Sequence, residues 1–194
     1  MLNLFKRKKT LEEQIQILAK CGICLNAGTT IDDLLAVFDR TEYEKNPFTM
    51  LMAVMGGEKE MKEGEWMSDN VWHFDTECIE DHGDYTRIAQ RLSVLAGSEL
   101  PLQDIKDHVD IEAGVAWLSF KLDGHDYKWN AKVEDDWVDT EIINKFRELI
   151  VSRKTDKKFI YFSEGGQDCI ICCLTTVQLH ELNDLTGIKF DQLQ

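Results

Sequence analysis

The stretch DNVWHFDTECIEDHGD, residues 69–84, has the residue types that come closest to a chemical site. It contains six carboxylates and two histidines but no lysine or arginine. On an extended strand, His73, Asp75 and Glu77 project from one side at intervals of about 7 Å. Imidazole nitrogens and carboxylate oxygens bind Mn²⁺, Fe²⁺ or Zn²⁺. We therefore predict a candidate site for a divalent transition metal at His73, Asp75, Glu77 and His82.

A metal here would indicate a metal-dependent hydrolase or oxygenase, with Glu80 or Asp84 as the general base that activates a bound water. The alternative is structural. Polar alternation is typical of the solvent-facing side of an antiparallel strand, and residues 81–84 would then form the turn before a helix. The pattern matches no fixed metal-ligand template, so it assigns no catalytic residue. Crowded carboxylates still favour a neutralising partner, either a metal or a basic protein.

A second acidic stretch surrounds Trp137. Asp135, Asp136 and Asp139 lie beside this tryptophan in the sequence. An exposed aromatic side chain ringed by carboxylates is a good anchor for a basic protein surface, so we predict that these four residues bind a partner. The alternative places Trp137 in the core and assigns the acidic residues to the N-terminus of the next helix, where negative charge is favourable.

The net charge of the chain is -14, although residues 6–9 are all basic. Such a field repels nucleic-acid phosphates and anionic lipids and attracts basic proteins. We therefore expect neither a nucleic-acid nor a membrane partner, although the acidic residues would also serve solubility alone. The sequence has no secretory signal and no apolar run of membrane-spanning length, which predicts a cytoplasmic protein.

Six cysteines are expected as thiols in that compartment. Cys21 with Cys24, and Cys169 with Cys172, have the spacing of a four-cysteine zinc site. The second pair lies in a run typical of a strand, however, whereas zinc knuckles place their cysteines on turns. We instead expect Cys169 and Cys173 to point into the core, and no cofactor follows from the cysteines.

The first 45 residues predict a helical N-terminal appendage. Thr10 with Glu13, and Thr30 with Asp33, are helix-start patterns, and the two helices are expected to pack as a hairpin. Residues 48–55 favour a buried strand by their length and flanking breakers, although their methionines also suit a helix.

The body, residues 47–190, shows two hairpin patterns. Strands 115–122 and 125–133 flank Asp123-Gly124, a dipeptide that suits a type I′ turn and places Phe120 opposite Tyr127 and Leu118 opposite Trp129. Strands 159–163 and 169–174 flank a glycine-containing loop. Shorter strands are expected at 71–77 and 105–111, and amphipathic helices begin near residues 84, 139 and 175. The whole chain, 1–194, therefore predicts a single α+β domain with a mainly antiparallel sheet covered by helices.

The combination of VWHFDTECIEDHGDY, YKWN, DDWVD, GGQD and ELNDLTGIKF resembles an uncharacterised family of small acidic bacterial cytoplasmic proteins. The resemblance covers roughly residues 47–190 and implies no activity and no catalytic residue. Small acidic α+β proteins of bacteria include immunity proteins that neutralise toxin domains, which is an analogy of class. The sequence therefore favours a module that binds a basic protein, with the metal-dependent enzyme and a purely structural fold as alternatives.

Overall fold

The computed structural model describes residues 9–59 and 64–193, and within them it confirms an α+β fold with antiparallel sheets. Its elements, in chain order, are α1 (Leu11–Lys20), α2 (Ile31–Val37), α3 (Arg40–Lys45), α4 (Thr49–Met55), β1 (Val71–Asp75), α5 (Asp84–Ala96), the short 3₁₀ helix η1 (Gly97–Glu99), β2 (Gln103–Asp110), β3 (Val115–Leu122), β4 (His125–Ala131), α6 (Thr140–Ser152), β5 (Lys157–Phe162), β6 (Asp168–Thr175), α7 (Thr176–Thr186) and β7 (Asp191–Gln192).

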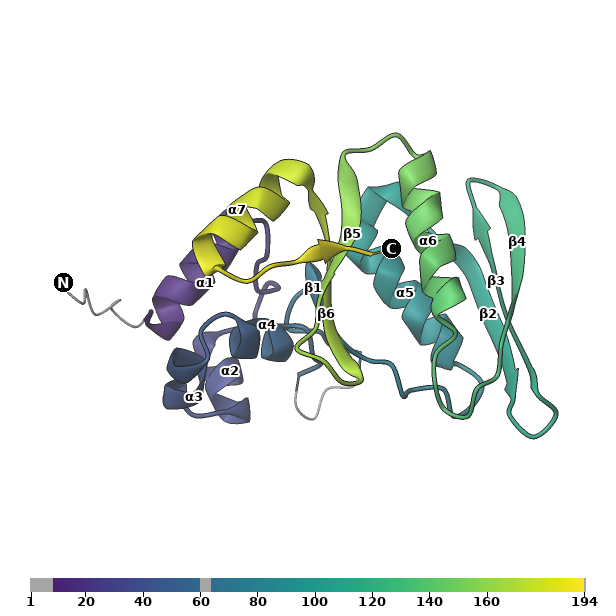
Figure 1. Ribbon diagram of the computed structural model, residues 1–194, viewed down its shortest axis with the longest axis horizontal. Coiled ribbons are helices and arrows are strands. Elements are labelled where there is room, and N and C mark those ends of the chain that lie inside the picture. Colours follow the sequence, from purple (N-terminus) through teal and green to yellow (C-terminus); the bar gives the residue numbers. More distant parts are fainter. Residues whose placement is uncertain (1–8, 60–63, 194) are drawn as a thin grey trace.

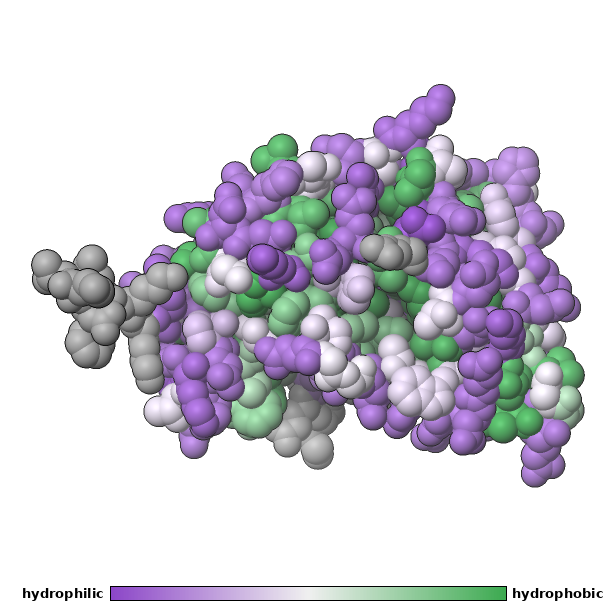
Figure 2. Space-filling model, in the orientation of Figure 1, coloured by the Kyte–Doolittle hydropathy of each residue, from purple (hydrophilic) through white to green (hydrophobic). Residues whose placement is uncertain are grey.

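The elements form alternating layers of helix and sheet (Figure 1). A four-stranded sheet with the order β1-β6-β5-β7 has α1 to α4 and α7 on one face. Helices α5 and α6 cover its other face and separate it from a three-stranded sheet with the order β2-β3-β4. The surface seen in Figure 2 is mostly hydrophilic, with hydrophobic residues visible in its middle. No helix in the described part of the chain is long and apolar enough to cross a membrane.

Strand β6 is buried on both faces because it lies inside the four-stranded sheet. Ile170, Cys172 and Leu174 face the N-terminal helices, whereas Ile171 and Cys173 face α5 and α6. This position explains its almost continuous apolar sequence. Cys169 packs against the same hydrophobic cluster as Cys173, as expected, and all six cysteines are free thiols.

The β3–β4 hairpin has the predicted register. Phe120 lies opposite Tyr127, and Leu118 lies opposite Trp129. Asp123 and Gly124 have φ angles of 51° and 77°, which are the positive values that a type I′ turn requires at both central positions. A two-residue turn of this type leaves only one register open to the flanking strands.

In the N-terminal region, one expectation is wrong and another is not clearly shown. The segment expected as a buried strand at residues 48–55 is the helix α4, so its methionines were the better guide. The first two helices form with their expected starts, but they do not form an evident hairpin. Helix α1 packs against α3, α4 and α7, and α2 packs against α4, because all of them cover one face of the sheet.

Helix α4 reaches the sheet through Gly56 at its C-terminal end. The backbone N–H of His73 donates to the carbonyl of Gly56 at 3.1 Å. A Cβ atom at Gly56 would lie 2.3 Å from His73 N, which leaves no room for a side chain. This close approach fixes the end of α4 against β1, the strand that carries His73 and Asp75.

Candidate partner-binding face and the neighbouring cleft

The two acidic stretches are adjacent in the fold. Glu77 and Trp137 are partners in an isolated antiparallel bridge. On either side of it, the N–H of Val138 donates to the carbonyl of Thr76 at 2.8 Å, and the N–H of Ile79 donates to the carbonyl of Asp136 at 2.9 Å. The segment after β1 therefore pairs with the segment before α6, which places Glu77 beside Trp137.

A tight turn presents Trp137 to solvent. The N–H of Trp137 donates to the carbonyl of Glu134 at 3.1 Å, and Asp135 within the turn has a φ of 57°. Left-handed backbone is uncommon outside glycine, but aspartate tolerates it better than most residues. The side chain of Trp137 is 43% exposed, so it does not belong to the core. The alternative that buried this tryptophan is therefore wrong.

Asp139 has a structural role at the start of α6. One of its carboxylate oxygens accepts the N–H of Glu141 at 3.0 Å, and the other accepts the N–H of Lys132 at 2.8 Å. It therefore caps the helix, as the alternative interpretation of this stretch predicted. Within the described residues, the side chains of Glu134, Asp135 and Asp136 have no hydrogen-bond or ion-pair partner. We call Glu77, Glu134, Asp135, Asp136 and Trp137 the acidic face.

Cys78 lies where the two acidic stretches meet and responds to both. Its pKa is raised to about 12, first by burial and then by the negative charges of Asp84, Asp75 and Asp136. These carboxylates come from both sides of the junction. The positive charge of Arg87 acts in the opposite direction, and the thiol stays protonated at neutral pH.

Two of the predicted metal ligands, Asp75 and His82, accept hydrogen bonds from groups of the protein. The carboxylate of Asp75 accepts the N–H of Glu77 at 2.9 Å and the side-chain amide of Gln167 at 3.2 Å. His82 lies in the turn before α5, where its Nδ1 accepts the N–H of Val109 at 3.1 Å. His73 instead lies near Asp168, with 3.7 Å between Nε2 and the carboxylate.

The proposed general bases, Glu80 and Asp84, lie just before α5 and at its first residue. The carboxylate of Asp84 accepts the N–H groups of Glu80 and Asp81, each at 2.8 Å, and so stabilises the turn before α5. Within residues 9–59 and 64–193, no group of three or more His, Cys, Asp or Glu side chains is arranged to hold a metal ion. The metal site remains a prediction of the sequence, without a structural observation that supports it.

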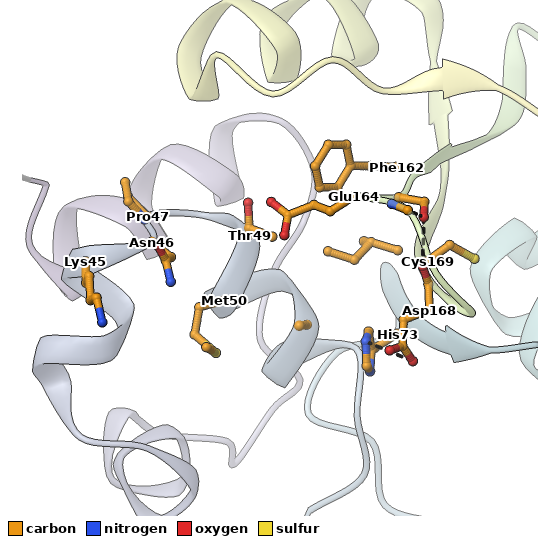
Figure 3. A pocket seen from close by; sticks show the side chains of 14 residues that line it. Lys45, Asn46, Pro47, Thr49, Met50, His73, Phe162, Glu164, Asp168 and Cys169 are labelled. Atoms are coloured by element: carbon orange, nitrogen blue, oxygen red, sulfur yellow. Dashed lines mark hydrogen bonds and ion pairs between the residues drawn. The ribbon is translucent and has the colours of Figure 1, made fainter.

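His73 lines an open cleft of about 510 Å³ between the α3–α4 corner and the β5–β6 hairpin (Figure 3). Met50 and Phe162 contribute apolar walls, and Lys45, Glu164 and Asp168 contribute charges of both signs. Figure 3 shows the ion-pair contact between His73 and Asp168 on one side of the cleft. Its lining is mixed in polarity, and it defines no particular reaction.

No local sequence pattern predicts the role of Gln167. Its carbonyl accepts the N–H of Thr76 at 3.1 Å and the hydroxyl of Thr76 at 2.8 Å. The β5–β6 loop is therefore joined to the segment that also pairs with Trp137. A glycine-containing loop indicates a turn but does not show which distant segment it contacts.

Comparison of the chain with protein-family models, curated proteins and solved structures gives no match. The resemblance to an uncharacterised bacterial family therefore stays a prediction.

Proposed function

We propose that this protein is a binding module that docks a basic protein surface on the acidic face. The observation that carries the proposal is the antiparallel pairing of Glu77 with Trp137, which places an exposed indole among carboxylates from both acidic stretches. A basic toxin domain is one partner of this chemistry, and neutralising it in a bacterial cytoplasm is the corresponding role.

The two parts of the face contribute differently to binding. Carboxylates without internal partners steer a basic surface and raise its association rate, with a strong dependence on ionic strength. The indole supplies apolar area that becomes buried on contact, and tryptophan is enriched among the residues that dominate binding energy. The face therefore combines long-range attraction with a short-range anchor.

The test uses an octalysine peptide as the probe. Its titration into isotopically labelled protein at low salt should shift the Trp137 indole signal and the amide signals of residues 76–79 and 134–138. The variant Glu134→Gln/Asp135→Asn/Asp136→Asn should weaken binding about fivefold to tenfold, because it removes two exposed charges and the half-buried charge of Asp136. Asparagine also tolerates the left-handed backbone of position 135.

A matched control removes three exposed charges elsewhere. Asp32→Asn/Glu181→Gln/Asp184→Asn changes α2 and α7, which lie on the opposite side of the four-stranded sheet. This variant should change the dissociation constant less than twofold. Equal losses for both variants, or signal shifts spread evenly over the molecule, would show that only net charge attracts the peptide and would overturn the proposal.

A further inference from the structure

A second hollow, with a volume of about 370 Å³, lies next to the acidic face. It opens between the β5–β6 hairpin, α6 and the paired residues Thr76 and Val138. Its apolar walls come from Phe74, Val138, Ile143, Tyr161, Ile171 and Leu193. Figure 1 shows the C-terminal end of the chain reaching the space between β5 and α6, and Figure 2 shows hydrophobic residues in the middle of the same view. We call this hollow the apolar slot.

The walls of the apolar slot are joined to one another by hydrogen bonds. Thr76 accepts the N–H of Val138 at 2.8 Å on one side and donates its hydroxyl to the carbonyl of Gln167 at 2.8 Å on the other. The N–H of Leu193 donates to the carbonyl of Phe159 at 3.2 Å and ties the C-terminal end to β5. A hollow with walls connected in this way exists before a ligand arrives, which lowers the entropic cost of filling it.

The polar groups of the slot restrict what it accepts. Among the described residues that line it there is one charged side chain, Asp168, with no lysine or arginine. Thr140 and Asn144 provide neutral polar groups at the start of α6. Burial raises the pKa of the Cys169 thiol to about 12, so this thiol stays uncharged at neutral pH. An apolar side chain of a partner that enters the slot therefore contacts no lysine or arginine among these lining residues.

Val138 connects the slot to the acidic face, since it lines the slot and directly follows Trp137. We propose that the apolar slot takes one aliphatic or aromatic side chain of the basic partner, while the acidic face takes the lysines or arginines that flank that side chain. This proposal rests on the proposed function and adds a sequence requirement for the partner. Charge complementarity selects a basic segment, and the slot selects an apolar residue within it.

The experiment compares two blocked peptides, KKLKK and KKAKK, as probes in the same titration. The leucine peptide should bind about tenfold more tightly, since only leucine fills the slot with apolar surface. It should also shift the side-chain amide signals of Asn144 and Gln167. Thr140→Trp, at an exposed position on the rim, should remove the preference for leucine by filling the slot.

The matched control is Val151→Trp, which adds the same side chain to α6 at a position that is 59% exposed and outside the slot. It should keep the leucine preference, which would support the proposal. Equal binding of both peptides, still weakened by Glu134→Gln/Asp135→Asn/Asp136→Asn, would overturn the slot and leave the proposed function standing. If both peptides bind equally and the charge variant does not weaken their binding, both the apolar slot and the proposed function are overturned.

Further measurements distinguish two other possible occupants of the slot, a free small molecule and a second copy of the chain. Uncharged acetyl-leucine amide should bind far more weakly than KKLKK, and equal affinity would identify a small-molecule site instead of a docking slot. Self-association of the unmodified protein that Thr140→Trp abolishes and Val151→Trp retains would identify a second copy of the chain as the occupant. Either result would overturn the proposal.

Discussion

Glu77 and Trp137 are antiparallel bridge partners, although one follows the first strand of the four-stranded sheet and the other precedes α6. Their pairing brings two stretches that both lack lysine and arginine onto one surface. Like charges placed together reduce the stability of the folded chain. The arrangement therefore has a cost that a basic partner would relieve.

The negative field around Trp137 is measurable without a partner. At low ionic strength, caesium should quench the exposed tryptophan fluorescence more strongly, and iodide more weakly, than each ion quenches free N-acetyltryptophanamide, because the surrounding carboxylates attract the cation. Glu134→Gln/Asp135→Asn/Asp136→Asn should bring the two quenching constants together, and Trp137→Phe should remove most of the quenchable signal. A ratio of iodide to caesium quenching as high as that of free N-acetyltryptophanamide would contradict a negative potential at this position.

Gly56 should tolerate no side chain. In Gly56→Ala the new Cβ would lie 2.3 Å from His73 N and 2.7 Å from the carbonyl carbon of Trp72, so α4 has to move away from β1. We expect a loss of roughly 2 kcal/mol or more in the free energy of unfolding, measured in urea. Gly57→Ala is the control, because its Cβ would meet nothing closer than 3.4 Å, and it should change stability by less than about 1 kcal/mol. Equal effects would show that the close approach is not the cause.

Arg91 should be the most sensitive charged residue of α5. Its Nη2 donates to the carbonyls of Ser68 and Val71 at 2.5 and 2.6 Å, and its guanidinium carbon lies 3.9 Å above the Trp66 ring. Burial lowers its pKa to about 10, which still leaves it charged at neutral pH.

Arg91→Met should therefore cost roughly 3 kcal/mol of unfolding free energy, because the carbonyls of Ser68 and Val71 lose their donor. The control is Arg87→Met on the same helix, where the side chain is 66% exposed and pairs with Glu58. That change should cost at most about 1 kcal/mol. A loss at Arg87 as large as the loss at Arg91 would show that burial of the guanidinium is not decisive.

Local patterns predicted the elements of this fold better than their arrangement. The capping boxes at Thr10 and Thr175 and the turn at Asp123 are set by neighbouring residues, and all three form as expected. The segment before Gly56 is a helix and not the expected strand, because an apolar run of this length suits a strand or a short helix equally. Its helical state is stabilised by packing on β1, which no local pattern contains.

For the candidate site too, the sequence predicted the residues better than their arrangement. The sequence singled out both acidic stretches and Trp137 by composition, but their adjacency follows from the hydrogen bonds of residues 76–79 with residues 136–138. The apolar slot is built from strands, a helix and the C-terminal end, so its residues are scattered along the chain. No spacing rule connects Phe74 with Leu193. Sites of this kind become visible only when the topology is known.

Stability should fall in alkaline solution because several protons are held more tightly in the folded state. The pKa values of Cys78, Cys169 and Cys173 are raised from 9.0 to about 12, mainly by burial, and that of Tyr85 is raised from 10.0 to about 12. Below pH 9 these groups are protonated in both states. As the pH rises from about 9 to 12, the unfolded chain releases protons that the folded chain keeps, so the unfolded state gains stability.

Urea unfolding between pH 7.5 and 10.5 should show this decrease. Cys173→Ala should make the decrease shallower, because one of the buried thiols is gone, whereas Cys24→Ser changes an exposed residue and should leave the pH dependence unaltered. The comparison removes the contribution of other titrating groups, which both variants share. The same slope in Cys173→Ala and the unmodified protein would show that the buried thiol is not linked to stability.

Metal addition separates the binding module from the metal-dependent enzyme. Nδ1 of His82 accepts a backbone N–H, and within the described residues no three His, Cys, Asp or Glu side chains are arranged to hold a metal ion. We therefore expect Zn²⁺ or Mn²⁺ to give no saturable rise in the melting temperature. A real site, at a free metal concentration one hundred times its dissociation constant, would add about 2.7 kcal/mol of stability. His73→Ala should then behave like the control His125→Ala at the β3–β4 turn, and a saturable rise that only His73→Ala removes would put the metal-dependent enzyme first.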